Sequence, residues 1–368
     1  MTRALPELCP VHIFAGFLGS GKTTLLRRVL QDPEFADTAV IINELGAVGL
    51  DHQLVRYAAD RIIVLPGGCI CCTVREDLEQ CLQELFGARD AGTIPAFRRL
   101  IIETTGIADP QPLIFTLYTS PLSTSRLCKP QVTTVVDGVL GATTLVNHAE
   151  AAAQIVAADT IIVSKRDLGP VDAVLKSLTA LNPWASVHAA DLLADDLGAV
   201  FADVAREIPV LTDDSVAQHL IQSPGRETTN HGDVRSLCLV LPQQLDWGGF
   251  GVWMSMLLHC HGEKILRSKG LLNIEGAKGP VVFQCAQHLV HPPEHWDTWP
   301  TPDHRSKLVL IVRGLEPADL LRSLEAFDAV AKGMASVPVT EGYLPAGGGG
   351  SVAGRPIRRP TAPRWIKG

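Results

Sequence analysis

The sequence predicts an α/β fold: a mostly parallel sheet in the first half, followed by a smaller α+β lobe. In the first half, short and fully apolar strands alternate with helical stretches, a pattern typical of parallel sheets covered on both faces. In the second half, strands are separated by single helices and turns, which favours a small α+β sheet. The 368 residues are enough for roughly two domains of ~150 residues each.

The elements of the first half follow from their apolar runs. The expected strands are Val11–Phe14, Ala39–Ile42, Arg61–Leu65, Leu100–Ile102, Thr133–Val136, Thr160–Val163 and Ser186–Ala189. Helices are expected at Lys22–Leu30 and at Glu76–Phe86, where leucines share one face. Asn182-Pro183 ends the helix before the last of these strands.

Polar sequence around Pro224-Gly225 marks the domain boundary. The expected division is a larger α/β domain over 1–206, a linker over 207–232, an α+β domain over 233–332 and a disordered tail over 333–368. Strands of the second lobe are expected at Val234–Leu241, Ile265–Ile274, Val281–Leu289 and Lys307–Val312, and helices at Trp247–His259 and Pro317–Val330.

Composition restricts the function classes. The content of 46% apolar and 19% charged residues is ordinary for a soluble globular protein. A net charge of −7 argues against a broad nucleic-acid footprint. No apolar run approaches the ~18 residues of a membrane span, and no signal peptide precedes the first motif. We therefore expect a cytoplasmic protein that binds neither nucleic acid nor membrane, and whose nine cysteines are thiols or metal ligands.

A phosphate-binding loop is predicted at Gly16–Thr23, which reads GFLGSGKT and matches GxxxxGK[ST]. Its glycines allow backbone N–H groups to surround a phosphate, and the helix behind it points its positive end at the same charge. Lys22 is expected to reach the β- and γ-phosphates, and the Thr23 hydroxyl to bind Mg²⁺. These features predict a P-loop nucleoside triphosphatase. The expected nucleotide-binding residues in this stretch are Gly16, Gly19, Ser20, Gly21, Lys22, Thr23 and Thr24.

Glu103 follows the strand Leu100–Ile102 and is itself followed by Thr-Thr-Gly106. A carboxylate at the C-terminal end of a strand beside a P-loop is placed for a Walker B role, through Mg²⁺ or its water. We therefore expect Glu103 to share catalysis with Lys22 and Thr23, and to share Mg²⁺ with Thr23. Gly106 would let the backbone approach the γ-phosphate, as a nucleotide switch requires.

Ser164-Lys165-Arg166-Asp167 follows the strand Thr160–Val163 and resembles the guanine-reading motif N-K-x-D, with Ser in place of Asn. Asp167 would accept hydrogen bonds from guanine N1–H and N2–H₂, a donor pair that adenine lacks. The aliphatic stem of Lys165 would lie over the base. Ser164, Lys165 and Asp167 therefore predict GTP as the substrate.

Cys69, Cys71 and Cys72 place three thiols within four residues, directly after Pro-Gly-Gly. The glycines allow a tight turn that aims several thiolates at one ion. Sulfur ligands suit Zn²⁺, and accept Co²⁺, Ni²⁺ or Fe²⁺ with less preference. Three ligands leave one position open, which suits a transferable ion better than a structural one. A redox pair and buried inert thiols remain the alternatives.

With these four motifs in order, the chain resembles the CobW-like family of metallochaperone GTPases, relatives of the urease and hydrogenase nickel-insertion GTPases. The resemblance runs from Val11 to about Val330, and its most specific element is the CxCC motif. It implies GTP hydrolysis coupled to delivery of a metal to a client metalloprotein, with zinc as the first expectation and cobalt or iron as others. It leaves open whether the protein forms a homo-oligomer.

Further segments carry the resemblance. The family's Asn-Glu-x-Gly segment corresponds to 43–46, and Ala47 stands where members often have Glu. If that missing carboxylate helps to hold metal or Mg²⁺, its role is either lost or shifted to Glu44 or Asp51; we include Glu44 among the expected metal ligands. Asp137 matches the family's Val-Val-Asp strand end, and Lys269-Gly270 the Lys-Gly turn of its C-terminal domain.

Six of the twelve histidines lie between His259 and His304. They are interpreted either as an auxiliary metal site or as hydrogen-bonded histidines in a domain interface, and the second reading is favoured. Two other functions compete with the metallochaperone. A P-loop small-molecule kinase would need an acceptor pocket and leaves the cysteines unexplained. A non-enzymatic metal buffer or sensor would bind metal independently of GTP.

Overall fold

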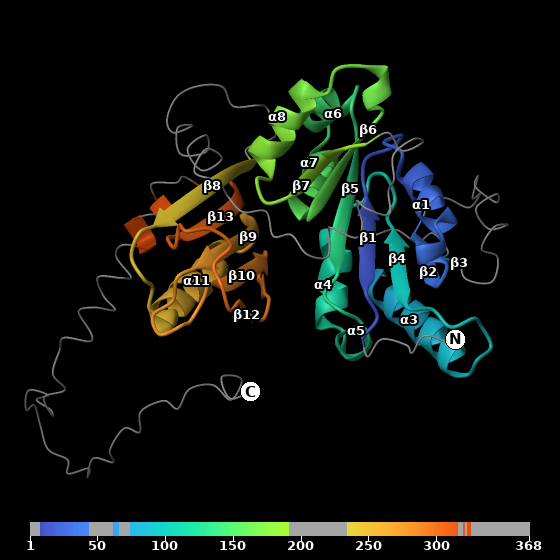
Figure 1. Ribbon diagram of the computed structural model, residues 1–368, viewed down its shortest axis with the longest axis horizontal. Helices are drawn as coiled ribbons and strands as arrows, with labels where there is room; N and C mark the ends of the chain where they lie inside the picture. The colour runs from blue at the N-terminus through green and yellow to red at the C-terminus, as the bar shows by residue number, and fades with distance from the viewer. Residues whose placement is uncertain are drawn as a thin grey trace, which may run out of the picture. The chain divides into compact units, whose positions relative to one another are not determined.

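The computed structural model describes residues 8–43, 62–65, 74–190, 234–315, 319–320 and 322–324. These residues form two sheets, each with its own helices and core (Figure 1). The expected linker 207–232 and tail 333–368 lie outside the described residues. Of the expected helix Pro317–Val330, only residues 319–320 and 322–324 are described, and they are helical.

The first sheet has seven strands in the order β3-β2-β4-β1-β5-β6-β7, and every neighbouring pair is parallel. Its strands are β1 (Val11–Ala15), β2 (Thr38–Asn43), β3 (Ile62–Leu65), β4 (Arg99–Glu103), β5 (Gln131–Asp137), β6 (Thr160–Ser164) and β7 (Ser186–Ala189). The predicted α/β class is confirmed. Because all strands run the same way, the residues that follow β1, β4, β5 and β6 meet at one edge of the sheet.

Helices cover both faces of this sheet. They are α1 (Lys22–Gln31), α3 (Val74–Asp90), α4 (Gln111–Thr119), α5 (Pro121–Arg126), α6 (Gly141–Asn147), α7 (Ala149–Ala157) and α8 (Asp172–Leu181), with short 3₁₀ turns η1 (Pro33–Phe35) and η2 (Arg166–Leu168). Phe14 and Ile101 pack with α1 residues on one face, whereas Ile13 and Ile102 pack with α3 and α4 residues on the other. This alternation explains why the strands are apolar throughout.

The second sheet is antiparallel, in the order β11-β10-β9-β13-β8, with β12 paired to β10. It is built from β8 (Val234–Leu241), β9 (Ile265–Leu272), β10 (Val281–Ala286), β11 (Leu289–Val290), β12 (Glu294–His295) and β13 (Ser306–Arg313), with helix α11 (Trp247–His261). Trp253 and Phe250 of α11 pack with Phe283 and Leu310 of the sheet in one buried core. The smaller α+β lobe is thus confirmed.

Two expectations for this lobe are corrected. The expected strand Val281–Leu289 turns back at Gln287, whose φ is 49°, so that Leu289 pairs antiparallel with Ala286. Lys269-Gly270 is not a turn, because both residues lie inside β9. Gly270 is explained by the neighbouring strand, since a Cβ there would come within 2.8 Å of the Lys307 carbonyl oxygen.

A buried ion cluster joins the two sheets, which belong to one compact unit, Met1–Asp328. Arg267 of β9 pairs with the Asp159 carboxylate and donates to the Ala157 and Ala158 carbonyls at the end of α7. Lys269 Nζ lies 3.6 Å from the same carboxylate. Burial alone would raise the pKa of Asp159, but the Arg267 and Lys269 cations hold that pKa well below its usual range.

Asp159→Asn is expected to destabilise the fold at neutral pH by about 2 kcal/mol, because the buried Lys269 and the half-buried Arg267 lose their carboxylate. The folded pKa of Asp159 is depressed, so its contribution is fully present above the unfolded value of ~3.9 and declines progressively as pH falls from there towards the folded value. Urea unfolding at pH 7 and pH 3 should therefore show a smaller difference between wild type and variant at pH 3 than at pH 7. An equal difference at both pH values would contradict this assignment.

Candidate nucleotide-binding site

The P-loop connects β1 to α1 through backbone conformations that glycine supplies. Gly16 has φ 144°, Gly19 has φ 73° and Gly21 has φ 101°. At Gly16 a Cβ would also lie 2.3 Å from the Val135 carbonyl oxygen, so no side chain fits there. The backbone path of this loop therefore requires glycine, and α1 begins directly after it, at Lys22.

The Lys22 ammonium is held over this loop. Its Nζ donates to the Gly16 carbonyl at 2.8 Å and to the Phe17 carbonyl at 3.2 Å. Burial lowers the pKa of Lys22, and the nearby Glu103 carboxylate opposes that shift. One buried positive charge thus lies beside the backbone N–H groups that begin α1, an arrangement suited to a polyphosphate.

Thr23 and Glu103 come together as the sequence predicts. Thr23 Oγ1 donates to Glu103 Oε1 at 2.9 Å, which joins α1 to the end of β4. Glu103 is only 5% exposed. A hydroxyl and a carboxylate are hard oxygen ligands, so the pair fits Mg²⁺.

The segment after Glu103 lies against the P-loop. Thr104 donates from its N–H to the Phe14 carbonyl at 2.9 Å, which continues the β4 pairing. Gly106 approaches Leu18 so closely that a Cβ would come within 2.8 Å of the Leu18 nitrogen. Gly106 is therefore required by close packing of two backbones.

The Ser164–Asp167 segment is tied to the P-loop at the end of β6. The buried Ser164 hydroxyl donates to the Ser20 carbonyl at 2.7 Å, so Ser164 supports the loop. Lys165 has φ 56°, and its Nζ donates to the Gly19 carbonyl at 2.9 Å and to Asp137 Oδ2 at 2.6 Å. Asp167 is exposed on η2, and Thr24 lies in the first turn of α1.

Two residues of this region were not among the predicted site residues. Asp137 pairs with Lys165, and its Oδ1 accepts from the Val139 and Leu140 N–H groups. Burial raises the pKa of Asp137, but Lys165 and these N–H groups bring it below its usual value. The position of Asp137 at the end of β5 is the sequence feature that could have identified it. Gln154 is discussed below; its signal is an uncharged polar side chain between apolar residues in the alanine-rich helix α7.

The expected metal ligands Cys69, Cys71, Cys72 and Glu44 lie outside the described residues, as does Ala47. Among the residues that are described, no group of three or more His, Cys, Asp or Glu side chains is arranged to hold a metal. His259 and His261 end helix α11. His291 is buried, with its ring 4.0 Å from that of Tyr118 of α4.

The fold and this loop define a P-loop nucleotide-binding protein. Residues 10–188 match the family model of the CobW/HypB/UreG nucleotide-binding domain, and residues 234–328 match that of the cobalamin synthesis protein cobW C-terminal domain. The chain belongs to the CobW/HypB/UreG family. Within the described residues, none of the helices has the length and apolar character needed to cross a membrane.

Relatives of this chain include proteins whose names refer to zinc. The zinc chaperone YjiA of Escherichia coli is 32% identical over 318 residues, which cover 85% of this chain and 96% of the relative. The crystal structure of Zn(II)-bound YjiA GTPase covers 88% of this chain and 99% of its own, with 27% identity and a TM-score of 0.67. The zinc-regulated GTPase metalloprotein activator 1 of Schizosaccharomyces pombe is 34% identical over 43% of this chain and 39% of the relative.

Proposed function

We propose that this protein hydrolyses GTP to GDP and phosphate and uses that cycle to deliver a metal ion, zinc first, to a client metalloprotein. The observation that carries the GTPase part is the assembly at one sheet edge. Lys22 covers the P-loop, Thr23 meets Glu103, and Lys165 meets Asp137 across β5 and β6. The metal part is supported by the zinc chaperone relatives and by the three thiols of the CxCC motif.

In the proposed reaction the protein positions the triphosphate and neutralises its charge. Lys22 places a cation at the β- and γ-phosphates, and the P-loop N–H groups bind the phosphate oxygens. Thr23 and Glu103 would hold Mg²⁺, which would neutralise charge on the phosphates when bound. The backbone at Gly106 would respond to the presence of the γ-phosphate and transmit that state to the segment that follows β4. Phosphoryl transfer needs little covalent chemistry from the protein, so we expect slow intrinsic turnover that a client stimulates.

Asp167 is proposed to select guanine, with Lys165 stacked on the base. Asp167→Asn should weaken GTP binding relative to ATP, because an amide offers one acceptor where two are needed. Each lost charge-assisted bond is worth ~1.5–3 kcal/mol. Competition of ATP and GTP for a fluorescent GDP analogue measures the ratio. A variant that keeps the full GTP preference would place base recognition elsewhere; Asp172→Asn, on exposed α8, is the control.

Cys69, Cys71 and Cys72, with Glu44, are proposed to bind the delivered metal. Thiolates favour Zn²⁺ over the harder cations, and Co²⁺ and Fe²⁺ are the alternative cargoes to be tested by competition. Free thiols are maintained in a reducing compartment, so the cytoplasm is the proposed location. The client is any metalloprotein that receives this ion.

Phosphate release from GTP in the absence of any acceptor is the direct test of the reaction class. The GTPase proposal expects release that requires Mg²⁺. A kinase acting on a small metabolite would instead hold GTP intact until its acceptor is added. Transfer of the γ-phosphate to a metabolite with no release of free phosphate would overturn the proposal.

A further inference from the structure

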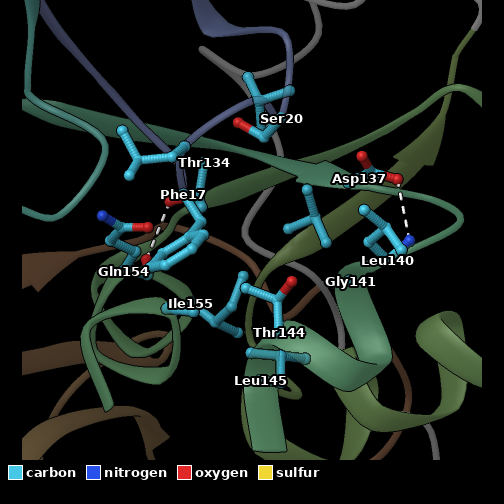
Figure 2. Close-up of a pocket in the computed structure, with 14 residues that line it drawn as sticks. Phe17, Ser20, Thr134, Asp137, Leu140, Gly141, Thr144, Leu145, Gln154 and Ile155 are labelled. Carbon is cyan, nitrogen blue, oxygen red and sulfur yellow. Dashed lines mark hydrogen bonds between the residues drawn. The ribbon is translucent and has the colours of Figure 1, made fainter. Parts of the chain in front are cut away.

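A cavity of about 170 Å³ lies between the P-loop, β5 and the helices α6 and α7 (Figure 2). The P-loop residues Phe17, Leu18 and Ser20 line it, whereas Lys22, Thr23, Glu103 and Lys165 do not. The cavity therefore lies apart from the expected lysine and Mg²⁺-binding side chains, although Ser20 belongs both to its wall and to the expected phosphate-binding loop.

Two buried polar atoms in this wall are unsatisfied. Gln154 and Ser20 are each 1% exposed, and neither Gln154 Oε1 nor Ser20 Oγ has a hydrogen-bond partner among the described residues. Figure 2 shows the Gln154 amide oxygen turned towards Phe17. Two other polar side chains of the lining are bonded: Thr134 Oγ1 donates to the Gln154 carbonyl, and Asp137 Oδ1 accepts from Leu140 N–H. The half-buried Thr144 adds one more hydroxyl to the lining.

The size and lining of the cavity suit an organic ring better than water. Leu145, Ala151 and Ile155 make much of its wall apolar. A buried water needs two to four polar partners and about 10–15 Å³ by this measure. Two unsatisfied atoms anchor few waters, whereas an apolar cavity of ~150 Å³ in another protein holds one benzene ring.

Gln154 connects this cavity to the segment after Glu103. Its Nε2 donates to the Gly106 carbonyl at 3.2 Å and to the Ala108 carbonyl at 2.9 Å. The same carboxamide thus offers its oxygen to the cavity and holds the expected switch segment with its nitrogen. A ligand that donates a hydrogen bond to Gln154 Oε1 would therefore fix the carboxamide and, through its nitrogen, the segment that contains Gly106 and Ala108.

We propose that this cavity is an effector site for a small neutral molecule with one aromatic ring and one hydrogen-bond donor, of the size of phenol. The donor bonds to Gln154 Oε1, and the ring packs against Phe17, Leu145 and Ile155. By holding Phe17 and Gln154 in place, the molecule restrains the P-loop and Gly106 and slows turnover. This effect rests on the proposed GTPase function, whereas the binding itself does not.

The binding test uses the full chain with phenol as the probe, and calorimetry and NMR measure the binding. Saturable binding of phenol is expected, and toluene, which has the ring without the donor, should bind roughly tenfold more weakly. Ala151→Leu and Thr144→Leu fill the cavity from α7 and α6 and should abolish binding. Ala173→Leu, on exposed α8, should leave it unchanged. Thermal melting identifies a cavity-filling variant that fails to fold, and the binding test then uses the variant that does fold.

The outcomes separate the site from the proposed function. Absence of saturable binding to the wild type, or undiminished binding to folded fillers, overturns the site. In hydrolysis assays phenol should lower kcat without raising KM for GTP, and the effect should vanish in the fillers. Binding with unchanged kcat overturns the effector role. If the wild type hydrolyses no GTP at all, the proposed function fails, and the binding experiment still decides the site.

Discussion

Lys22→Ala is expected to abolish GTP hydrolysis, with a loss of at least ~10³-fold in kcat. Lys22 is the buried cation whose Nζ lies over the P-loop, bonded to the Gly16 and Phe17 carbonyls. Without it, the charge that develops on the β- and γ-phosphates loses its main neutralising group. Phosphate release under saturating Mg²⁺ and GTP measures the loss.

Lys176→Ala, which removes an exposed lysine of α8, is the matched control and should keep the wild-type rate. Thermal melting of both variants separates a catalytic loss from an unfolded chain. Phosphate release at the wild-type rate from Lys22→Ala would exclude Gly16–Thr23 as the active P-loop.

Thr23→Val is expected to lower kcat by roughly 10²–10³-fold. The substitution keeps the shape of the side chain but removes the hydroxyl that donates to Glu103 Oε1 at 2.9 Å. If this hydroxyl and the Glu103 carboxylate together hold Mg²⁺, the variant should also need far more Mg²⁺ for half-maximal activity. A titration of hydrolysis against Mg²⁺ measures both effects.

Thr23→Ser should restore most of the activity, because serine supplies the same oxygen. Thr179→Val, on the exposed side of α8, controls for the loss of a threonine hydroxyl elsewhere. A normal Mg²⁺ requirement in Thr23→Val would show that the cation is held by other residues.

The parts of the site that depend on short motifs are those the sequence could predict. Glu103 ends β4, and Lys22 and Thr23 begin the helix that follows β1. Because β1 and β4 are parallel neighbours, their ends lie at one edge of the sheet, so this meeting follows from the topology. The partners of Lys165 and Ser164 could not be predicted in the same way. Asp137 and the Ser20 carbonyl are 28 and 144 residues away, and only strand register and loop conformation select them.

The failures in the second lobe have a similar cause. The turn at Gln287 carries no Gly or Pro signal, and its positive φ is seen only in the folded chain. Gly270 was interpreted as a turn residue, whereas the close approach of β13 requires it inside a strand. In the first lobe, Gln154 lies in the alanine-rich and mostly buried helix α7, and its hydrogen bonds to Gly106 and Ala108 depend on how that helix packs.

The central claim is that nucleotide state controls metal affinity, so metal and Mg-GTP must bind cooperatively. The coupling between the two sites is reciprocal: if Mg-GTP raises the affinity for the metal, the metal raises the affinity for Mg-GTP by the same factor. Thiolate ligation also releases protons, so metal binding should weaken at low pH. Cys→Ser at Cys69, Cys71 and Cys72 should remove the cooperativity and leave nucleotide binding largely intact.

The most direct measurement is a Zn²⁺ titration of the full chain with Mg²⁺ and either GDP or a non-hydrolysable GTP analogue. The account predicts that the two affinities differ by roughly 5- to 150-fold, the usual range of coupling between two sites, with tighter binding in the GTP state. Equal Zn²⁺ affinity in the two nucleotide states would contradict the metallochaperone switch and leave a metal buffer or a structural site.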